Sequence, residues 1–162
     1  MSRKKKFKKR TIKQDSIYNS KLISMIINKI LKNGKKTIAQ NILYNSMTKL
    51  KQKTKKDPLQ IIEIAMKNIT PSVEVKSRRV GGSVYPVPIE INAERGTSIA
   101  LGFLIKSTKE RNEKNSKNNF SDTLTNEILD ASNNIGNSVK KKEELHKKAN
   151  ANKAFSKFKQ KK

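Results

Sequence analysis

Apolar residues recur three and four positions apart in six stretches of the chain, which is the spacing of amphipathic helices. Asn33-Gly34 ends the first stretch, because glycine accepts the left-handed conformation of a helix C-terminus. Asp57 and Pro58 begin the third as a capping residue and a first-turn proline. Thr97 or Ser98 can cap the fourth. The predicted helices span about residues 17–33, 35–53, 58–70, 98–110, 120–131 and 138–155.

Each predicted helix has its own set of residues expected to face a shared core. These are Leu22, Ile23, Ile26, Ile27, Ile30; Ile38, Ala39, Ile42, Leu43, Leu50; Leu59, Ile62, Ala65 or Met66, Ile69; Ile99, Ala100, Phe103, Leu104; Phe120, Leu124, Ile128, Ala131; Val139, Leu145, Ala149 and Phe155.

Between the third and fourth helices the period changes from helical to two. Residues 73–80 and 83–91 alternate in character on either side of Gly81-Gly82. A Gly-Gly pair between alternating runs predicts a two-residue β-hairpin. Such a loop pairs Val80 with Ser83, Arg78 with Tyr85 and Lys76 with Val87.

Two prolines in the second strand indicate that this hairpin stands alone as a ribbon. In the predicted register Pro86 and Pro88 occupy non-hydrogen-bonded positions, and they discourage a third strand. An isolated two-stranded ribbon is marginally stable in water, so it should lean on something, and its Lys76, Arg78 and Arg79 suggest RNA. The expected fold is mainly α, a bundle-like domain of six helices with one protruding two-stranded β-hairpin between helices three and four.

The composition points to a polyanionic partner. The 162 residues include 38 Lys and Arg against 13 Asp and Glu, a formal charge of +25. A nucleic acid would neutralise this charge and gain affinity from counterion release. Residues 1–70 hold 19 of the basic residues and only 3 of the acidic ones, so the partner should grip the N-terminal half harder.

The same composition limits the other classes of protein. Absence of Cys excludes disulfides and thiolate chemistry and argues against structural zinc. No apolar run reaches a membrane span, and the first ten residues lack the features of a secretory signal or a transit peptide. The chain divides into a basic disordered arm over residues 1–16, a single helical RNA-binding domain over 17–156 with its ribbon at 73–91, and a basic tail over 157–162.

Several segments, in order along the chain, resemble the family of the seventh small-subunit ribosomal protein. They are Gly34-Lys35-Lys36-Thr37, the stretch from Pro71 to Ser83 containing VKSRRVGGS, Val87-Pro88-Ile89-Glu90, and Ala149 to Phe155. The VKSRRVGGS stretch is long enough to be highly specific. The sequence at Met1-Ser2-Arg3 and over residues 15–36 is more similar to plastid-encoded members of the family than to typical bacterial ones. Gly102 and Glu110 depart from the bulky, basic middle that the family usually has in its fourth helix.

This resemblance implies a six-helix fold with a ribbon and no enzymatic activity or cofactor. It implies binding to the 3′ major domain of small-subunit ribosomal RNA (rRNA) and nucleation of head assembly. It also implies a ribbon at the exit site, near tRNA and mRNA and near neighbouring head and platform proteins. The expected location is the ribosome of the plastid stroma, with the cytoplasm of an AT-rich bacterium as the alternative.

The candidate rRNA-binding residues are all basic. Most of them fall into three groups: the N-terminal arm, the pair Lys35-Lys36 and the ribbon. Lys35-Lys36 begin a helix, where a phosphate would meet backbone N–H groups as well as ammonium groups, and Arg78-Arg79 offer guanidinium forks on opposite ribbon faces. The full set is Arg3, Lys4, Lys5, Lys6, Lys8, Lys9, Arg10, Lys35, Lys36, Lys76, Arg78, Arg79 and Arg95; candidates for contact with tRNA, mRNA or a neighbouring protein are Gly81, Gly82, Ser83 and Tyr85.

Simpler interpretations remain open for each group. The arm would then be a nonspecific solvating tail, Lys35-Lys36 a tolerated surface pair, and the arginines a basic edge that prevents aggregation. Tyr85 would either stack on a base or pack under the Arg78 stem. His146, the only histidine, has no evident nucleophile or metal partner and is expected to be structural or solvent-facing.

One other function fits a helical body with a basic, proline-bearing ribbon. DNA-architectural proteins wedge such ribbons into the minor groove. Six helices are too many for the small dimeric versions of that design. An RNA-modifying enzyme would need a cofactor loop or a positioned acid and base, and the sequence offers neither.

Overall fold

A computed structural model describes residues 11–114 and 119–158 of the chain. The elements are α1 (Lys21–Ile30), α2 (Lys36–Thr54), α3 (Pro58–Ile69), β1 (Val73–Val80), β2 (Ser83–Glu90), α4 (Ala93–Lys114), α5 (Phe120–Ser132), α6 (Asn137–Ala151) and a 3-10 helix, η1 (Lys153–Phe158). Over the described residues the architecture is therefore the predicted one, mainly helical with one hairpin between α3 and α4.

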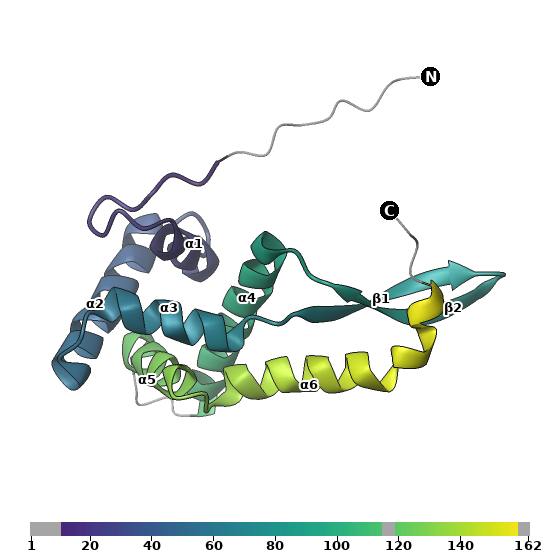
Figure 1. The fold of residues 1–162 in the computed structure, drawn as a ribbon. Helices are drawn as coiled ribbons and strands as arrows, with labels where there is room; N and C mark the ends of the chain where they lie inside the picture. The colour runs from purple at the N-terminus through teal and green to yellow at the C-terminus, as the bar shows by residue number, and fades with distance from the viewer. Residues whose placement is uncertain (1–10, 115–118, 159–162) are drawn as a thin grey trace, which may run out of the picture.

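Helices α1 to α5 form a body from which two elements extend side by side (Figure 1). The ribbon β1–β2 reaches away from the body, and α6 runs along it. Helix α6 packs against β1, and η1 packs against β2. The ribbon does lean on something, as predicted, but the support seen here is the C-terminal part of the chain, which the sequence did not indicate.

The core lies among the five helices of the body, where the apolar stripes meet. Its largest fully buried side chains are Ile23, Ile26, Ile27, Leu43, Met47, Leu50, Ile62, Ile69, Leu101, Leu104, Leu124 and Ile128. Most predicted inward positions are confirmed. The prediction for Ile38 is wrong. Ile38 lies in the first turn of α2 and is 52% exposed, whereas the adjacent Ala39 is buried in the core.

Two predicted helix starts are wrong for identifiable reasons. Helix α1 begins at Lys21, not near Ile17, because residues 16–18 form a turn on the side chain of Asp15. Helix α4 begins at Ala93. The Thr97 hydroxyl, which resembles a cap in the sequence, instead donates to the Ala93 carbonyl from inside the helix, at 2.9 Å.

Three predicted helix ends also differ. Helix α1 ends at Ile30, before the predicted stop at Asn33-Gly34. Helix α4 continues to Lys114, beyond the predicted end near residue 110, and Arg111 is anchored there by carboxylates of α5. Helix α6 ends at Ala151, and the chain tightens into η1 before Phe155. This change of helix type turns Phe155 toward the ribbon.

The hairpin forms in the predicted register. Val80 pairs with Ser83, Arg78 with Tyr85 and Lys76 with Val87. Gly81 and Gly82 both have positive φ, at 57° and 90°, which is the geometry of the tight turn whose twist matches the strands.

Candidate nucleic-acid interface

Acidic side chains are used inside the protein to join its elements. Glu127 of α5 is completely buried and accepts hydrogen bonds from Arg111 and from the backbone N–H and hydroxyl of Ser138, at the start of α6. Arg111 also pairs with Asp130 at 2.6 Å, and this hydrogen bond is the main reason that the pKa of the Arg111 guanidinium is raised. Burial opposes the rise, and Glu127 adds to it. One buried carboxylate therefore ties α4, α5 and the first turn of α6 together.

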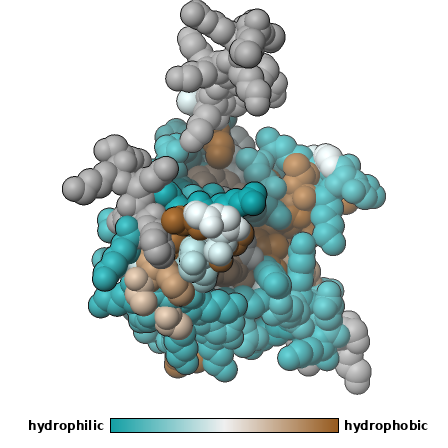
Figure 2. Space-filling model, turned by 90° about the vertical axis from the view of Figure 1, so that its right-hand side faces the viewer, coloured by the Kyte–Doolittle hydropathy of each residue, from teal (hydrophilic) through white to brown (hydrophobic). Residues whose placement is uncertain are grey.

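Because the acids are occupied in this way, the basic excess lies on the surface. The described residues hold all 13 acidic residues and 27 of the basic ones. The acids that accept a hydrogen bond or ion pair within the chain include Asp15, Asp57, Glu74, Glu110, Asp122, Glu127 and Asp130. Seen end-on from the ribbon side, the surface is mostly hydrophilic (Figure 2). Such a surface suits a phosphate backbone.

The base of the ribbon is fixed by one carboxylate shared between two candidate cations. Glu74 of β1 is 7% exposed and accepts from Nε of Arg95 at 2.8 Å, and Nζ of Lys76 lies 3.0 Å away. The hydrogen bond from Arg95 is the main reason that the pKa of Glu74 lies below its usual value. Arg95 keeps 55% of its side chain exposed.

This arrangement predicts a pH dependence of stability. The pKa of Glu74 is lower in the folded state, so its contribution is present above the unfolded pKa, near 4.5, and is lost as pH falls through the folded value. We expect the free energy of unfolding of Glu74→Gln to change less than that of the wild type between about pH 6 and pH 3. Urea unfolding across this range measures the difference. Glu143→Gln, on the exposed side of α6, is the control and should follow the wild type; parallel curves for Glu74→Gln would contradict the role.

The two ribbon arginines have different surroundings. Alternation along the strands places Arg78 on the face that also carries Tyr85 and Val87, and Arg79 on the opposite face. Val87 is fully buried and Tyr85 packs on Phe155 of η1, so this face is partly covered. Arg78 is half-buried and Arg79 is exposed. The two arginines therefore lie on opposite faces, as predicted, and Arg79 is the more exposed of the two.

Tyr85 has a third role that the sequence did not indicate. Its ring lies 5.4 Å from that of Phe155, centroid to centroid, with a 41° tilt between the planes. An aromatic pair at this distance contributes about 0.5–1.5 kcal/mol beyond the area it buries. Phe155 therefore holds the outer half of the ribbon against η1.

Removing this ring should loosen the ribbon without unfolding the body. We expect amide hydrogens of β1 and β2 near Tyr85 to exchange about three- to tenfold faster in Phe155→Ala. Hydrogen–deuterium exchange read by mass spectrometry measures this, with Lys153→Ala, exposed on the same 3-10 helix, as the control. Unchanged exchange in the ribbon would show that η1 does not support it.

Lys35 and Lys36 lie where the sequence placed them, at the start of a helix. Helix α2 begins at Lys36, with neither a capping side-chain hydrogen bond nor an acidic residue in its first turn. Both lysines are exposed. The seven basic residues between positions 3 and 10 lie outside the described residues.

His146 is structural, as expected. Its Nε2 accepts a hydrogen bond from the backbone N–H of Ser72 at 3.3 Å, which joins α6 to the start of β1. Burial, and then the charge of Lys142, lower the pKa of His146. The neutral imidazole is the form that accepts this bond.

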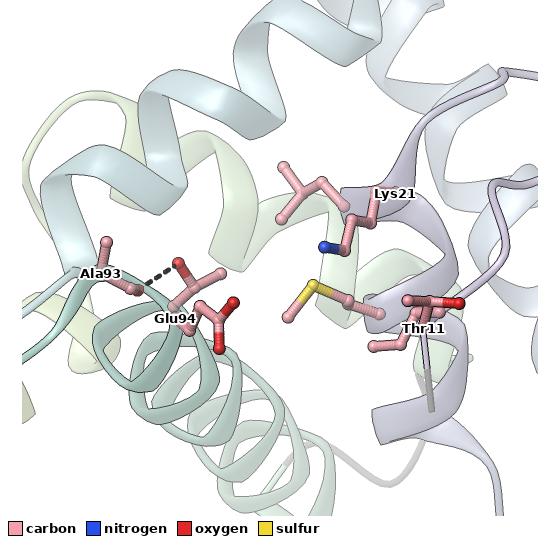
Figure 3. A pocket seen from close by; sticks show the side chains of 8 residues that line it. Thr11, Lys21, Ala93 and Glu94 are labelled. Carbon is pink, nitrogen blue, oxygen red and sulfur yellow. Dashed lines mark hydrogen bonds between the residues drawn. The ribbon is translucent and has the colours of Figure 1, made fainter. Parts of the chain in front are cut away.

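Three further observations bear on other chemistry. No group of three or more potential metal-ligating side chains occurs in the described part of the chain. A cleft of about 590 Å³ lies between α1 and the start of α4, with Lys21 on one wall and Glu94 on the other (Figure 3). Apolar atoms of Ile12, Leu22 and Met25 line much of it.

Among the described helices, none combines the length and apolar character needed to cross a membrane.

Comparison with known proteins decides the family. The family model described as ribosomal protein S7p/S5e matches residues 2–153. The chain belongs to this family. It is accordingly a structural, non-enzymatic constituent of the small ribosomal subunit.

Curated relatives within the S7 family match along nearly their whole length. The small ribosomal subunit protein uS7c of Euglena gracilis is 54% identical over 98% of this chain and 99% of its own length. The corresponding protein of Tupiella akineta is 48% identical over the same shares. The small ribosomal subunit protein uS7 of Gloeothece citriformis is 47% identical, again over 98% and 99%. The resemblance drawn from VKSRRVGGS and the neighbouring segments is confirmed.

Glu110, one of the two departures from the S7 family pattern, has an intramolecular task. Its carboxylate lies 2.6 Å from Nζ of Lys141, and this bond is the main cause of its lowered pKa. The bond joins α4 to α6. Glu110 thus neutralises a lysine of its own chain.

Sequence patterns did not indicate the side chains that position the basic residues in this S7 family member. Glu74, Phe155, Asp15 and Tyr44 all make contacts between segments distant in the sequence. Only the scarcity of acids could have indicated Asp15 and Glu74, because a carboxylate in a basic segment is usually retained for a specific bond.

Proposed function

We propose that this chain binds the 3′ major domain of small-subunit rRNA and nucleates assembly of the subunit head. The observation that carries the proposal is the separation of charge: acids hold the helices together, and lysines and arginines remain on the surface. Membership of the S7 family identifies rRNA as the polyanion, since a protein of this family is part of a ribosome.

Two basic surfaces would make the contacts within the described residues. One is the uncapped start of α2 with Lys35 and Lys36, which offers backbone N–H groups and two ammonium groups to a phosphate. The other is the ribbon with Lys76, Arg78, Arg79 and the adjacent Arg95. The basic residues of the N-terminal arm would add contacts in RNA grooves and order on binding.

The ribbon would lie at the exit site, near tRNA and mRNA and near neighbouring head and platform proteins. It projects from the body, as such a reach requires (Figure 1). Its tip, from Val80 to Val84, exposes Gly81, Gly82, Ser83 and two valine side chains, of which Val84 is 64% exposed. A small, partly apolar tip of this kind suits contact with a protein or a nucleoside more than with phosphates alone.

Binding to matched nucleic acids tests the proposal. At the same salt concentration, the chain should bind a 3′ major-domain rRNA fragment more tightly than duplex DNA of equal length. Stronger retention on the duplex would favour the DNA-architectural function instead. The chain should also co-sediment with small ribosomal subunits after a high-salt wash, and loss in the wash would contradict a structural place in the subunit.

The proposed location is the plastid stroma. Relatives such as the uS7c protein of Euglena gracilis support it, and the match to Gloeothece citriformis keeps a bacterial cytoplasm as the alternative. Immunodetection of the protein in isolated plastids would decide between them.

A further inference from the structure

A cluster of lysines lies at the corner where α2 ends and α3 begins. Residues 51–56 read KQKTKK, and all four lysines among them are exposed. The only acidic residue within residues 16–62 is Asp57. Its carboxylate caps α3 by accepting a hydrogen bond from the backbone N–H of Leu59, at 3.1 Å. The neighbouring sequence therefore leaves most of the positive charge of this corner unbalanced.

Three of these lysines have no partner within the part of the chain that the structure describes. Lys53 is the fourth, and it donates to the side chain of Asn126 on α5 at 2.7 Å. The ion pairs and side-chain hydrogen bonds among the described residues involve none of the other three ammonium groups. We call Lys51, Lys55 and Lys56 the corner lysines.

Lys55 has a backbone conformation that is unfavourable for a lysine. It ends α2 with a φ of 56°, in the left-handed region, and its N–H bonds to the carbonyl of Lys51 at 2.9 Å. The other non-glycine residues with positive φ in the described ranges are all asparagines: Asn19, Asn33 and Asn134. Glycine and asparagine tolerate this conformation, whereas the Cβ of other residues comes too close to the backbone. A lysine at this position therefore lowers stability, which points to a use of its side chain outside the fold.

The dipole of α2 explains only part of the cluster. Cations near a helix C-terminus are favourable, because they face the negative end of the dipole. Lys51 and Lys53 lie in the last turn of α2 and fit this explanation. Lys55 does not need to be a lysine for this purpose, because the last turn already holds two cations.

The corner is remote from the two basic surfaces described above. It lies at the end of the body away from the ribbon (Figure 1). Helix α2 has 19 residues, and its length of about 28 Å separates the corner from Lys35 and Lys36. This distance exceeds the screening length of about 8–10 Å at moderate salt. The corner lysines therefore add little to the attraction at either of those surfaces, and a polyanion must reach the corner itself to gain from them.

We propose that the corner lysines bind the phosphate backbone of a segment of rRNA distinct from the segments that meet the ribbon and the start of α2. The proposal rests on the proposed function for the identity of the polyanion. Residues 51–56 contain no arginine and no aromatic residue, so the corner has the groups that contact phosphates and lacks those that stack on bases. These contacts add affinity without sequence specificity and fix the body at the end opposite the ribbon.

Lys55→Asn tests the proposal, because it should raise stability and lower affinity at the same time. Asparagine suits the left-handed conformation, so the midpoint of thermal unfolding should rise by about 2–4 °C. Loss of one phosphate contact should weaken binding to the 3′ major-domain rRNA fragment about threefold and reduce the salt slope by about 1. Thermal unfolding and equilibrium binding over a range of salt concentrations measure the two effects. A midpoint that does not rise, or an affinity that does not fall, would overturn the proposal.

Replacing all three corner lysines should enlarge the loss of binding without unfolding the protein. The variant carries Lys51→Gln, Lys55→Asn and Lys56→Gln. We expect it to bind the rRNA fragment at least about tenfold more weakly, with a salt slope reduced by about 2–3. Circular dichroism checks that its helix content matches that of the wild type.

The matched control removes the same charge from α6. It replaces Lys140, Lys147 and Lys148 by glutamine; all three are exposed, but Glu143 and Glu144 lie among them and already reduce their local charge. This control should change the salt slope by less than about 1. Equal losses in the two triple variants would mean that only total charge matters and would overturn the proposal. An unchanged affinity of the corner variant would also overturn it, and is the result expected if the corner faces an acidic protein. Failure of the unmodified chain to bind the fragment would overturn the proposed function itself.

Discussion

Glu127→Ala is expected to lower the free energy of unfolding by about 3 kcal/mol. Glu127 is fully buried, and its removal leaves Arg111 without one of its two carboxylates and the Ser138 N–H at the start of α6 without its acceptor. The estimate is at the low end for a buried pair, because Arg111 is 32% exposed and keeps Asp130. Urea unfolding followed by circular dichroism measures the change.

Two further variants separate the charge from the shape. Glu127→Gln keeps an acceptor for Ser138 but gives Arg111 no charge, so we expect roughly half the loss of the alanine variant. Glu143→Ala, an exposed glutamate on α6, should stay within about 0.5 kcal/mol of the wild type. A Glu127→Ala protein as stable as this control would show that α6 is held by other contacts.

Arg79→Ala is expected to weaken binding to the rRNA fragment about tenfold, and Arg78→Ala clearly less. Arg79 is exposed on one face of the ribbon, whereas Arg78 shares the other face with the Tyr85–Phe155 contact and is half-buried. A guanidinium that is free to approach a phosphate or a base makes two hydrogen bonds, and one that is partly covered has fewer orientations available. Equilibrium binding at constant salt compares the two variants.

Arg79→Lys is the matched control for this comparison. Lysine keeps the charge but loses the planar fork, so the variant should bind with an affinity between those of the wild type and Arg79→Ala. A larger loss for Arg78→Ala than for Arg79→Ala would mean that the covered face of the ribbon, after movement of η1, is the one that meets RNA.

Local patterns in the sequence were sufficient for the ribbon. Strand alternation and a Gly-Gly turn specify both its existence and its register, because each signal acts within a few residues. The helix starts at Lys21 and Ala93 were missed for the opposite reason. Thr97 has the chemistry of a cap, but its hydroxyl bonds to the Ala93 carbonyl one turn earlier inside α4. The turn before α1 depends on Asp15, whose partner Tyr44 lies on another helix.

The candidate site divides in the same way. Lys35, Lys36 and Arg79 were identified from residue type and position, and all three are exposed. Arg95 was identified as a cation for RNA, but its Nε is bonded to Glu74 across 21 residues of sequence. Arg78 lies beside Tyr85, whose ring packs on the distant Phe155. Sequence separation of this size leaves no local signal, so such roles emerge only from tertiary structure.

The contact between η1 and the ribbon also has a consequence for the order of synthesis. Phe155 follows Tyr85 by seventy positions, so translation produces the hairpin well before the ring that steadies it. A nascent chain paused between the two would expose a loose, arginine-bearing hairpin beside a helical body that can already fold. Fixing the ribbon in place is therefore one of the last events in the synthesis and folding of the chain.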